Sequence, residues 1–200
     1  MKQLMCAATV MLAMAAVPAS AQQANPPAKP QGHADHDKAT KSGAAANDSQ
    51  FVMKVASDGI AEVELGRLAA DKASSPDVKK FAQRMVDDHS KANDELKTLA
   101  QNKNITLPAA IDAKHKAHVD RLSKLSGEAF DRSYMRDMLM DHQKAVAAFR
   151  TESKSGKDAD VKAWAGKTLP TLEEHLKLAQ DANKSVVGTT GTKSKSPAKK

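Results

Sequence analysis

Four ionisable residues stand where the sequence otherwise places apolar side chains. Glu62, His89, His142 and His175 each occur in a row of mostly apolar residues spaced alternately four and three apart. Such spacing places them on the inward face of an amphipathic helix. Each predicted long helix carries one of them, near its middle or, for His175, somewhat past it. In an up-and-down bundle the four side chains are therefore expected to converge.

A buried imidazole or carboxylate is costly unless it has a partner, and one metal ion would partner all four. Imidazole with carboxylate suits zinc, iron(II), manganese or copper(II), so the sequence predicts a single transition-metal ion as cofactor. A hydrogen-bonded polar layer without metal is the alternative. Met85 and Met138 each precede a histidine by four residues. Their sulfur atoms would suit copper(I), but core filling is the preferred interpretation.

Further polar residues surround the predicted cluster. Asp58 and Asp141 lie near the inward faces and are expected to accept hydrogen bonds from the ligands. Tyr134, two turns before His142, is either a proton donor or a core tyrosine that needs one hydrogen bond. His115 and His118 stand among lysines and are predicted to be surface residues. The sequence has no Gly-x-Ser-x-Gly, no His-Glu-x-x-His and no phosphate-binding glycine loop, so no catalytic residue is assigned.

Helical periodicity runs through most of the chain, and no segment alternates as a strand would. Four long helices and one short helix are predicted, at residues 50–72, 76–102, 111–125, 128–153 and 158–184. Asp48 or Ser49 would cap the first helix, and Ser75 followed by Pro76 begins the second. Pro170 is expected to kink the last helix because it removes one backbone donor.

The lengths of the connections predict how the helices pair. The first two long helices are joined by about three residues, as are the last two, so each pair forms an antiparallel hairpin. The middle connection is long and carries the short helix. The expected fold class is therefore all-α, an antiparallel four-helix bundle of the ferritin-like type, with a short crossover helix between helices two and three.

The amino terminus has the pattern of a secretory signal peptide. Residues 1–21 combine a basic start at Lys2, an apolar run and small residues at Ala19 and Ala21, so cleavage is expected before Gln22. The apolar run is shorter than the roughly 20 residues that span a membrane, and no transmembrane segment is expected in the mature chain. The predicted location is the periplasm or the cell envelope.

The rest of the chain divides where its composition changes. Residues 22–48 are predicted to be a disordered linker, 49–184 the bundle domain and 185–200 a disordered basic tail. The net charge of +7 comes mostly from the tail, because the bundle is nearly neutral. The tail either contacts an envelope partner or an anionic surface or is simply solvated, which is the preferred interpretation, and nucleic-acid binding is not expected without interleaved aromatic residues. The single cysteine lies in the leader, so the mature chain has no thiol chemistry.

Three stretches resemble a bacterial family called domain of unknown function 4142. They read AEVELG at residues 61–66, FAQRMVDDH at 81–89 and TLPTLEEH at 168–175. The resemblance covers residues 50–182 and implies an exported protein with a ferritin-like fold, without an established activity. It places the family's polar positions at Glu62, His89, His142 and His175.

Two functions follow as hypotheses. The first is an exported metal-binding bundle that stores, buffers or senses an ion or supports a reaction at a single metal ion. The second is a non-enzymatic structural or interaction module of the cell envelope with a metal-free polar core layer. Ferritin-like di-iron proteins carry Glu-x-x-His on two helices, whereas here the residues three before the histidines are apolar: Val86, Leu139 and Leu172. A single ion is therefore the better fit.

Overall fold

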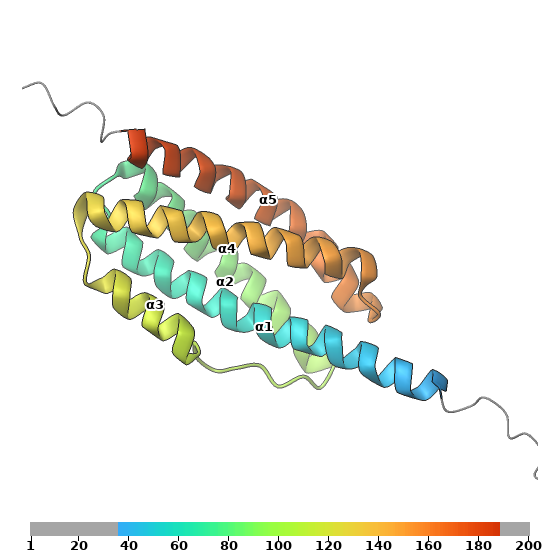
Figure 1. The fold of residues 1–200 in the computed structure, drawn as a ribbon. Helices are drawn as coiled ribbons and strands as arrows, with labels where there is room; N and C mark the ends of the chain where they lie inside the picture. Colours follow the sequence, from blue (N-terminus) through green and yellow to red (C-terminus); the bar gives the residue numbers. More distant parts are fainter. Residues whose placement is uncertain (1–35, 189–200) are drawn as a thin grey trace, which may run out of the picture. The chain divides into compact units, whose positions relative to one another are not determined.

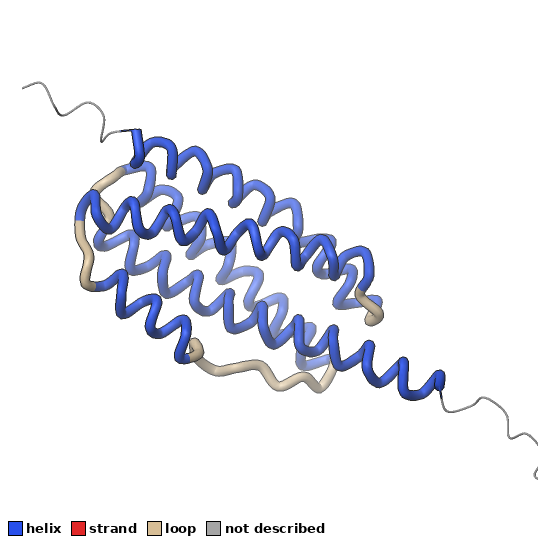
Figure 2. The backbone as a smooth tube through the Cα atoms, viewed as in Figure 1, coloured by secondary structure: helices blue, strands red, loops and turns tan. Residues whose placement is uncertain are grey.

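The computed structural model describes the backbone of residues 36–188 and the side chains of residues 47–188. Five helices run in order: α1 (His36–Lys72), α2 (Pro76–Asn102), α3 (Ala113–Ser123), α4 (Gly127–Ser155) and α5 (Ala159–Gly188) (Figure 1). These residues contain no strand (Figure 2). The predicted signal peptide, linker residues 22–35 and tail residues 189–200 lie outside the described part of the chain.

The four long helices close into a ring of contacts. Helix α1 packs along α2 and α4 along α5, while α2 also contacts α5 and α1 contacts α4. Gly66 permits a close approach in the first hairpin, since a Cβ atom there would lie 3.0 Å from the carbonyl oxygen of Ala82. Helix α3 belongs to the long crossover and packs against α1 and α4 (Figure 1). The predicted four-helix bundle with two hairpins and a crossover helix is confirmed.

Local capping explains two of the helix starts. The Ser75 side chain accepts a hydrogen bond from the backbone of Val78, and Pro76 is the first helical residue, as predicted. In the crossover, the Asp112 side chain accepts a hydrogen bond from the backbone nitrogen of His115 at 2.8 Å.

Helix α5 continues through Pro170 and ends four residues after the predicted Lys184.

The start of α1 differs from the prediction. The helix begins at His36 rather than at Gln50, so it passes through the predicted linker and through its boundary at residue 48. Asp48 therefore does not cap α1. Its buried carboxylate accepts hydrogen bonds from the backbone nitrogens of Lys157 and Asp158, just before α5. A carboxylate at a helix start satisfies unpaired backbone donors and interacts favourably with the positive end of the helix dipole, and here that helix is α5.

Two apolar clusters fill the bundle on either side of a polar layer. The methionine end is defined here by the buried side chains of Leu65, Phe81, Met85, Phe130, Tyr134, Met135 and Met138. The tryptophan end is defined by Val52, Leu96, Val146, Phe149, Val161, Leu172 and the partly buried Trp164. The polar layer consists of Glu62, His89, His142 and His175, which fall between the two clusters along their helices.

Most of the large apolar side chains in the described part of the chain lie in or against the core, whereas Met53, Met140 and Val187 are exposed. Among the described residues, no helix is long and apolar enough to cross a membrane.

Candidate metal centre

Three histidines from three helices converge in the polar layer. His89 of α2, His142 of α4 and His175 of α5 each offer one ring nitrogen, and these atoms all lie within 4.8 Å of one another. The ring centroids form a triangle with sides of 5.3, 5.4 and 5.8 Å. The residues are far apart in the sequence, and the two hairpins bring them to one level because each sits between the apolar ends of its helix.

Hydrogen bonds fix which nitrogen of two rings carries the proton. His142 donates from Nδ1 to the backbone oxygen of Met138 at 2.9 Å. His175 donates from Nε2 to Asp88 Oδ2 at 2.8 Å. A carbonyl or carboxylate oxygen can only accept, so the remaining nitrogen of each neutral ring carries a lone pair.

The remaining nitrogens have no partner. His142 Nε2, His175 Nδ1 and His89 Nε2 are buried and make no hydrogen bond within the described part of the chain. A buried polar atom without a partner costs free energy, and most such atoms in folded proteins are satisfied. Three of them in one cluster form a donor set that a metal ion would satisfy together.

The environment keeps all three imidazoles neutral near pH 7. Burial, and then the neighbouring His175, lowers the pKa of His142 to about 4. Burial and the two other rings lower the pKa of His89 well below its usual range. Burial also lowers the pKa of His175, although Asp88 opposes this shift. Neutral imidazole is the form that binds metal, so the cluster needs no deprotonation at neutral pH.

Glu62 is not part of this convergent group. The carboxyl group lines the same cavity, and its Oε2 atom is buried without a hydrogen-bond partner among the described residues. Burial, followed by the charges of Asp141 and Asp58, raises the pKa of Glu62 to about 8. The structure thus unites the three histidines predicted from the sequence, whereas the predicted glutamate lines the same cavity, where the negative charges of Asp141 and Asp58 act on it.

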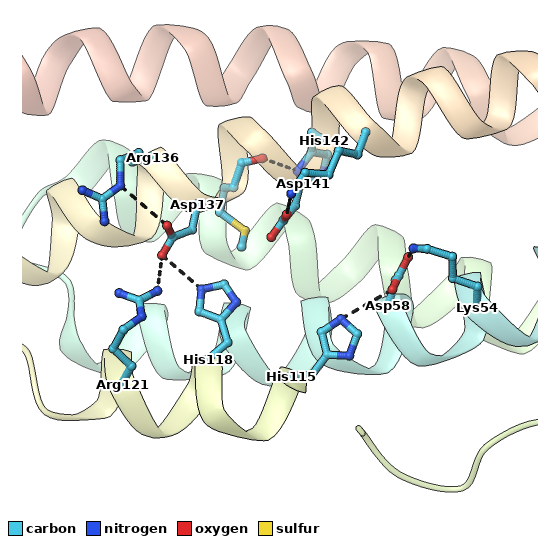
Figure 3. A network of polar contacts seen from close by, with 11 residues as sticks. Lys54, Asp58, His115, His118, Arg121, Arg136, Asp137, Asp141 and His142 are labelled. Carbon is cyan, nitrogen blue, oxygen red and sulfur yellow. Dashed lines mark hydrogen bonds and ion pairs between the residues drawn. The ribbon is translucent and has the colours of Figure 1, made fainter. Parts of the chain in front are cut away.

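The cavity has a volume of about 630 Å³ and is lined by α1, α2, α4 and α5 together with the crossover helix. His115 and His118 of α3 both line it, and each side chain is only 18% exposed. Their prediction as surface residues is wrong. His118 Nε2 lies 3.0 Å from Asp137 Oδ2, and His115 Nε2 lies 3.4 Å from Asp58 Oδ1 (Figure 3).

A family model for "Domain of unknown function (DUF4142)" matches residues 33–182, which is most of the chain. The chain belongs to this family. No curated protein matches it.

Two solved structures share the fold of this DUF4142 chain. They are "CopM in the Cu(I)-bound form", with a TM-score of 0.58, and "CopM in the Cu(II)-bound form", with a TM-score of 0.59. Each is 20% identical and covers 69% of this chain and 96% of its own. At this identity the likeness shows a common fold.

In the DUF4142 chain, the predicted acceptors Asp58 and Asp141 line the cavity and pair with Lys54 and His115, and with Lys144, rather than with the three histidines. Met85, Met138 and Tyr134 lie in the methionine end. Met85 and Met138 are fully buried there and do not line the cavity, which fits core filling. Tyr134 stacks on Phe130, and its buried hydroxyl has no hydrogen-bond partner among the described residues. Burial, and then Glu62, raises the pKa of Tyr134 well above its usual range, so the hydroxyl keeps its proton.

Asp88 is a site residue that sequence reasoning missed. It accepts from both His175 and Arg84, and these hydrogen bonds lower the pKa of Asp88 although burial opposes the shift. A carboxylate bonded to a ligand histidine holds the ring in one orientation and raises its basicity. Periodicity could not reveal this role, because Asp88 precedes His89 by one residue and points about 100° away from it.

Proposed function

We propose that this protein binds one transition-metal ion through His89, His142 and His175. The observation that supports the proposal is the set of three buried, unpartnered ring nitrogens, one from each residue. Each histidine belongs to a different helix, so the ion would link α2, α4 and α5. A fourth ligand would be a water molecule or a carboxylate from the cavity.

Three imidazoles suit zinc, copper, iron or nickel. Copper is the first ion to test, because two solved structures that share this fold are titled as Cu(I)-bound and Cu(II)-bound forms of CopM. Zinc, iron(II) and manganese should be tested beside copper. The predicted leader supports export, so the protein would store, buffer or sense the ion in the periplasm or cell envelope. The tail lysines would add contact with an anionic surface or an envelope partner.

The test is a thermal-shift series on metal-stripped protein with copper, zinc, iron(II) and manganese. An ion that binds only the folded state at a hundred times its Kd stabilises it by about 2.7 kcal/mol, or roughly 5–10 °C. His142→Ala should abolish this gain. His118→Ala is the matched control, because it removes a histidine of the same cavity that is hydrogen-bonded to Asp137. The control should keep the gain.

The orienting role of Asp88 gives a graded second measurement. Asp88→Asn should weaken the affinity for the ion by about 10–100-fold, since it disturbs the ring of His175 without removing a ligand. If no metal shifts the melting temperature at saturating concentration and neutral pH, the metal proposal fails. The envelope module with a metal-free polar layer would then be the better account of the three histidines.

A further inference from the structure

We infer that the cavity binds a neutral aromatic molecule with an acceptor oxygen, and that this molecule packs on a wall formed by Phe51, Phe149 and Trp164. The site shares the cavity with the three histidines but needs no metal ion, so it does not depend on the function proposed above.

The aromatic wall is defined by the rings of Phe51, Phe149 and Trp164, which contact one another in sequence. The ring centroids of Phe51 and Phe149 lie 5.1 Å apart at an interplanar angle of 70°. Those of Phe149 and Trp164 lie 5.5 Å apart at 48°. The three residues come from α1, α4 and α5, and all of them line the cavity. A flat ring can stack on one such ring and meet the edge of the next.

The other aromatic side chains do not border this cavity. The chain has four phenylalanines, one tyrosine and one tryptophan, so the wall holds half of its aromatic residues. Phe81, Phe130 and Tyr134 are at most 4% exposed and are covered within the methionine end. Phe51 and Trp164, in contrast, are only partly buried although they pack against an apolar cluster. A ligand ring on the wall would remove further apolar surface from water.

Trp164 also has a hydrogen-bond donor without an acceptor. Its Nε1 atom is buried and makes no hydrogen bond within the described part of the chain. The indole N–H can only donate, and in a buried tryptophan it usually has a partner. The two phenylalanines of the wall carry no acceptor. An oxygen atom on the bound molecule would satisfy this donor.

The size of the cavity sets the size of the molecule. An apolar cavity of about 150 Å³ already holds benzene, and drug-sized ligands occupy sites of about 300–1,000 Å³. The cavity here measures about 630 Å³. It therefore has room for two fused rings with substituents.

The charges on the cavity favour a neutral molecule. Three ion pairs stand among the lining residues: Lys54–Asp58, Lys144–Asp141 and Arg121–Asp137. These side chains largely compensate one another, so they select neither an anion nor a cation. The lining beside the aromatic wall is apolar and includes Val55, Leu96, Ala145 and Leu172.

The experiment is a titration of the full chain with Prodan, a neutral aminonaphthalene that carries one ketone oxygen. The titration is made at neutral pH with a chelator present, so failure of the three-histidine metal site would not change its result. Prodan emission moves to shorter wavelength in an apolar site. Trp164 is the only tryptophan in the chain, so quenching of its fluorescence reports a molecule bound close to the wall.

Two variants on α4 form a matched pair. Ala145 is partly buried and lines the cavity, so Ala145→Phe fills it. Ala147 is exposed and does not line the cavity, so Ala147→Phe is the control. We expect wild type and Ala147→Phe to bind one Prodan per chain with equal affinity. Ala145→Phe should lose about tenfold or more, because its ring takes the space of the ligand.

Two competitors test the hydrogen bond to Trp164. Acetylnaphthalene and ethylnaphthalene have nearly the same shape, but only the ketone carries an acceptor. The ratio of their affinities, measured by displacement of Prodan, should favour the ketone about 2–10-fold more in wild type than in Trp164→Phe. Circular dichroism confirms that each variant is folded. No saturable binding by wild type, equal binding by Ala145→Phe and wild type, or the same competitor ratio in Trp164→Phe and wild type overturns the inference.

Discussion

The methionine end and the polar layer are adjacent turns of the same helices, and on α4 they are buried equally. Met85 precedes His89 by four residues, and Met138 precedes His142 by four. Met138 is 0% exposed and His142 is 1% exposed. The methionines, however, bury only apolar surface, whereas the histidines bury nitrogen atoms that have no hydrogen-bond partner among the described residues.

Equal burial therefore has opposite energetic consequences in the two regions. Burying a methionine side chain stabilises the fold by about 1.5–3 kcal/mol, whereas a buried polar atom without a hydrogen bond costs about 1–3 kcal/mol. Burial of the methionine end raises the free energy of unfolding. The unpartnered polar atoms of the polar layer lower it, unless a ligand such as a metal ion binds them. The comparison teaches that fractional exposure alone does not separate structural residues from functional ones. What separates them is whether each buried polar atom has a hydrogen-bond partner.

The largest effect is expected from opening the methionine end. Met138→Ala should destabilise the protein by about 2–5 kcal/mol, because it removes buried methylene groups and leaves a cavity. Met53→Ala is the matched control on α1, where the side chain is 40% exposed and the change should stay within about 0.5 kcal/mol. Urea unfolding followed by circular dichroism measures both. Equal losses in the two variants would show that the methionine end is not the stabilising region.

A smaller effect is expected from the pH dependence of the polar layer. In the metal-free protein the pKa of Glu62 is about 8, against 4.5 in an unfolded chain. The stability from this group is fully present below pH 4.5 and is lost as the pH rises through 8. The lowered pKa of His142, about 4 against 6.5, has the opposite effect, and its contribution is complete above pH 6.5.

Between pH 6.5 and 8, Glu62 therefore determines how the free energy of unfolding changes with pH. Metal-free wild type should lose about 1–2 kcal/mol of unfolding free energy over this interval. Glu62→Gln should remove most of the loss, and Glu64→Gln should keep it. Urea denaturation in the presence of a chelator, repeated at several pH values, makes the comparison. A parallel decline in Glu62→Gln and wild type would mean that another group causes the pH dependence.

The sequence predicts the parts of this molecule that depend on local patterns. Ser75 and Pro76 place the start of α2 at its observed residue because capping and the missing proline donor act within one turn. The histidines of the polar layer were found by their spacing, since helical period determines which face a residue occupies. Connection lengths were enough to predict the two hairpins and the crossover.

The sequence could not show contacts made between distant segments. Asp48 looks like a local cap, yet it binds backbone donors more than a hundred positions away at Lys157 and Asp158. His118 looks like a surface residue beside lysines, yet Asp137 of α4 covers it. Glu62 has the correct face and level for the histidine cluster, and Asp58 and Asp141 were expected to accept hydrogen bonds from the ligands; only the packing of α1 against α4 shows that their negative charges act on Glu62.

The smallest change in stability is expected from replacing one of the three histidines by an apolar residue. His89 Nε2 is buried without a partner among the described residues, so His89→Leu removes an unsatisfied atom and supplies a side chain of similar size. In the metal-free protein this variant should differ from wild type by about 1 kcal/mol or less, and it should show no metal-induced gain. The same substitution at His118 should cost about 1 kcal/mol or more, since it takes a hydrogen-bonded partner from the buried Asp137. A loss in His89→Leu as large as that in Met138→Ala would mean that the histidines stabilise the fold without metal, and the polar layer would then be structural.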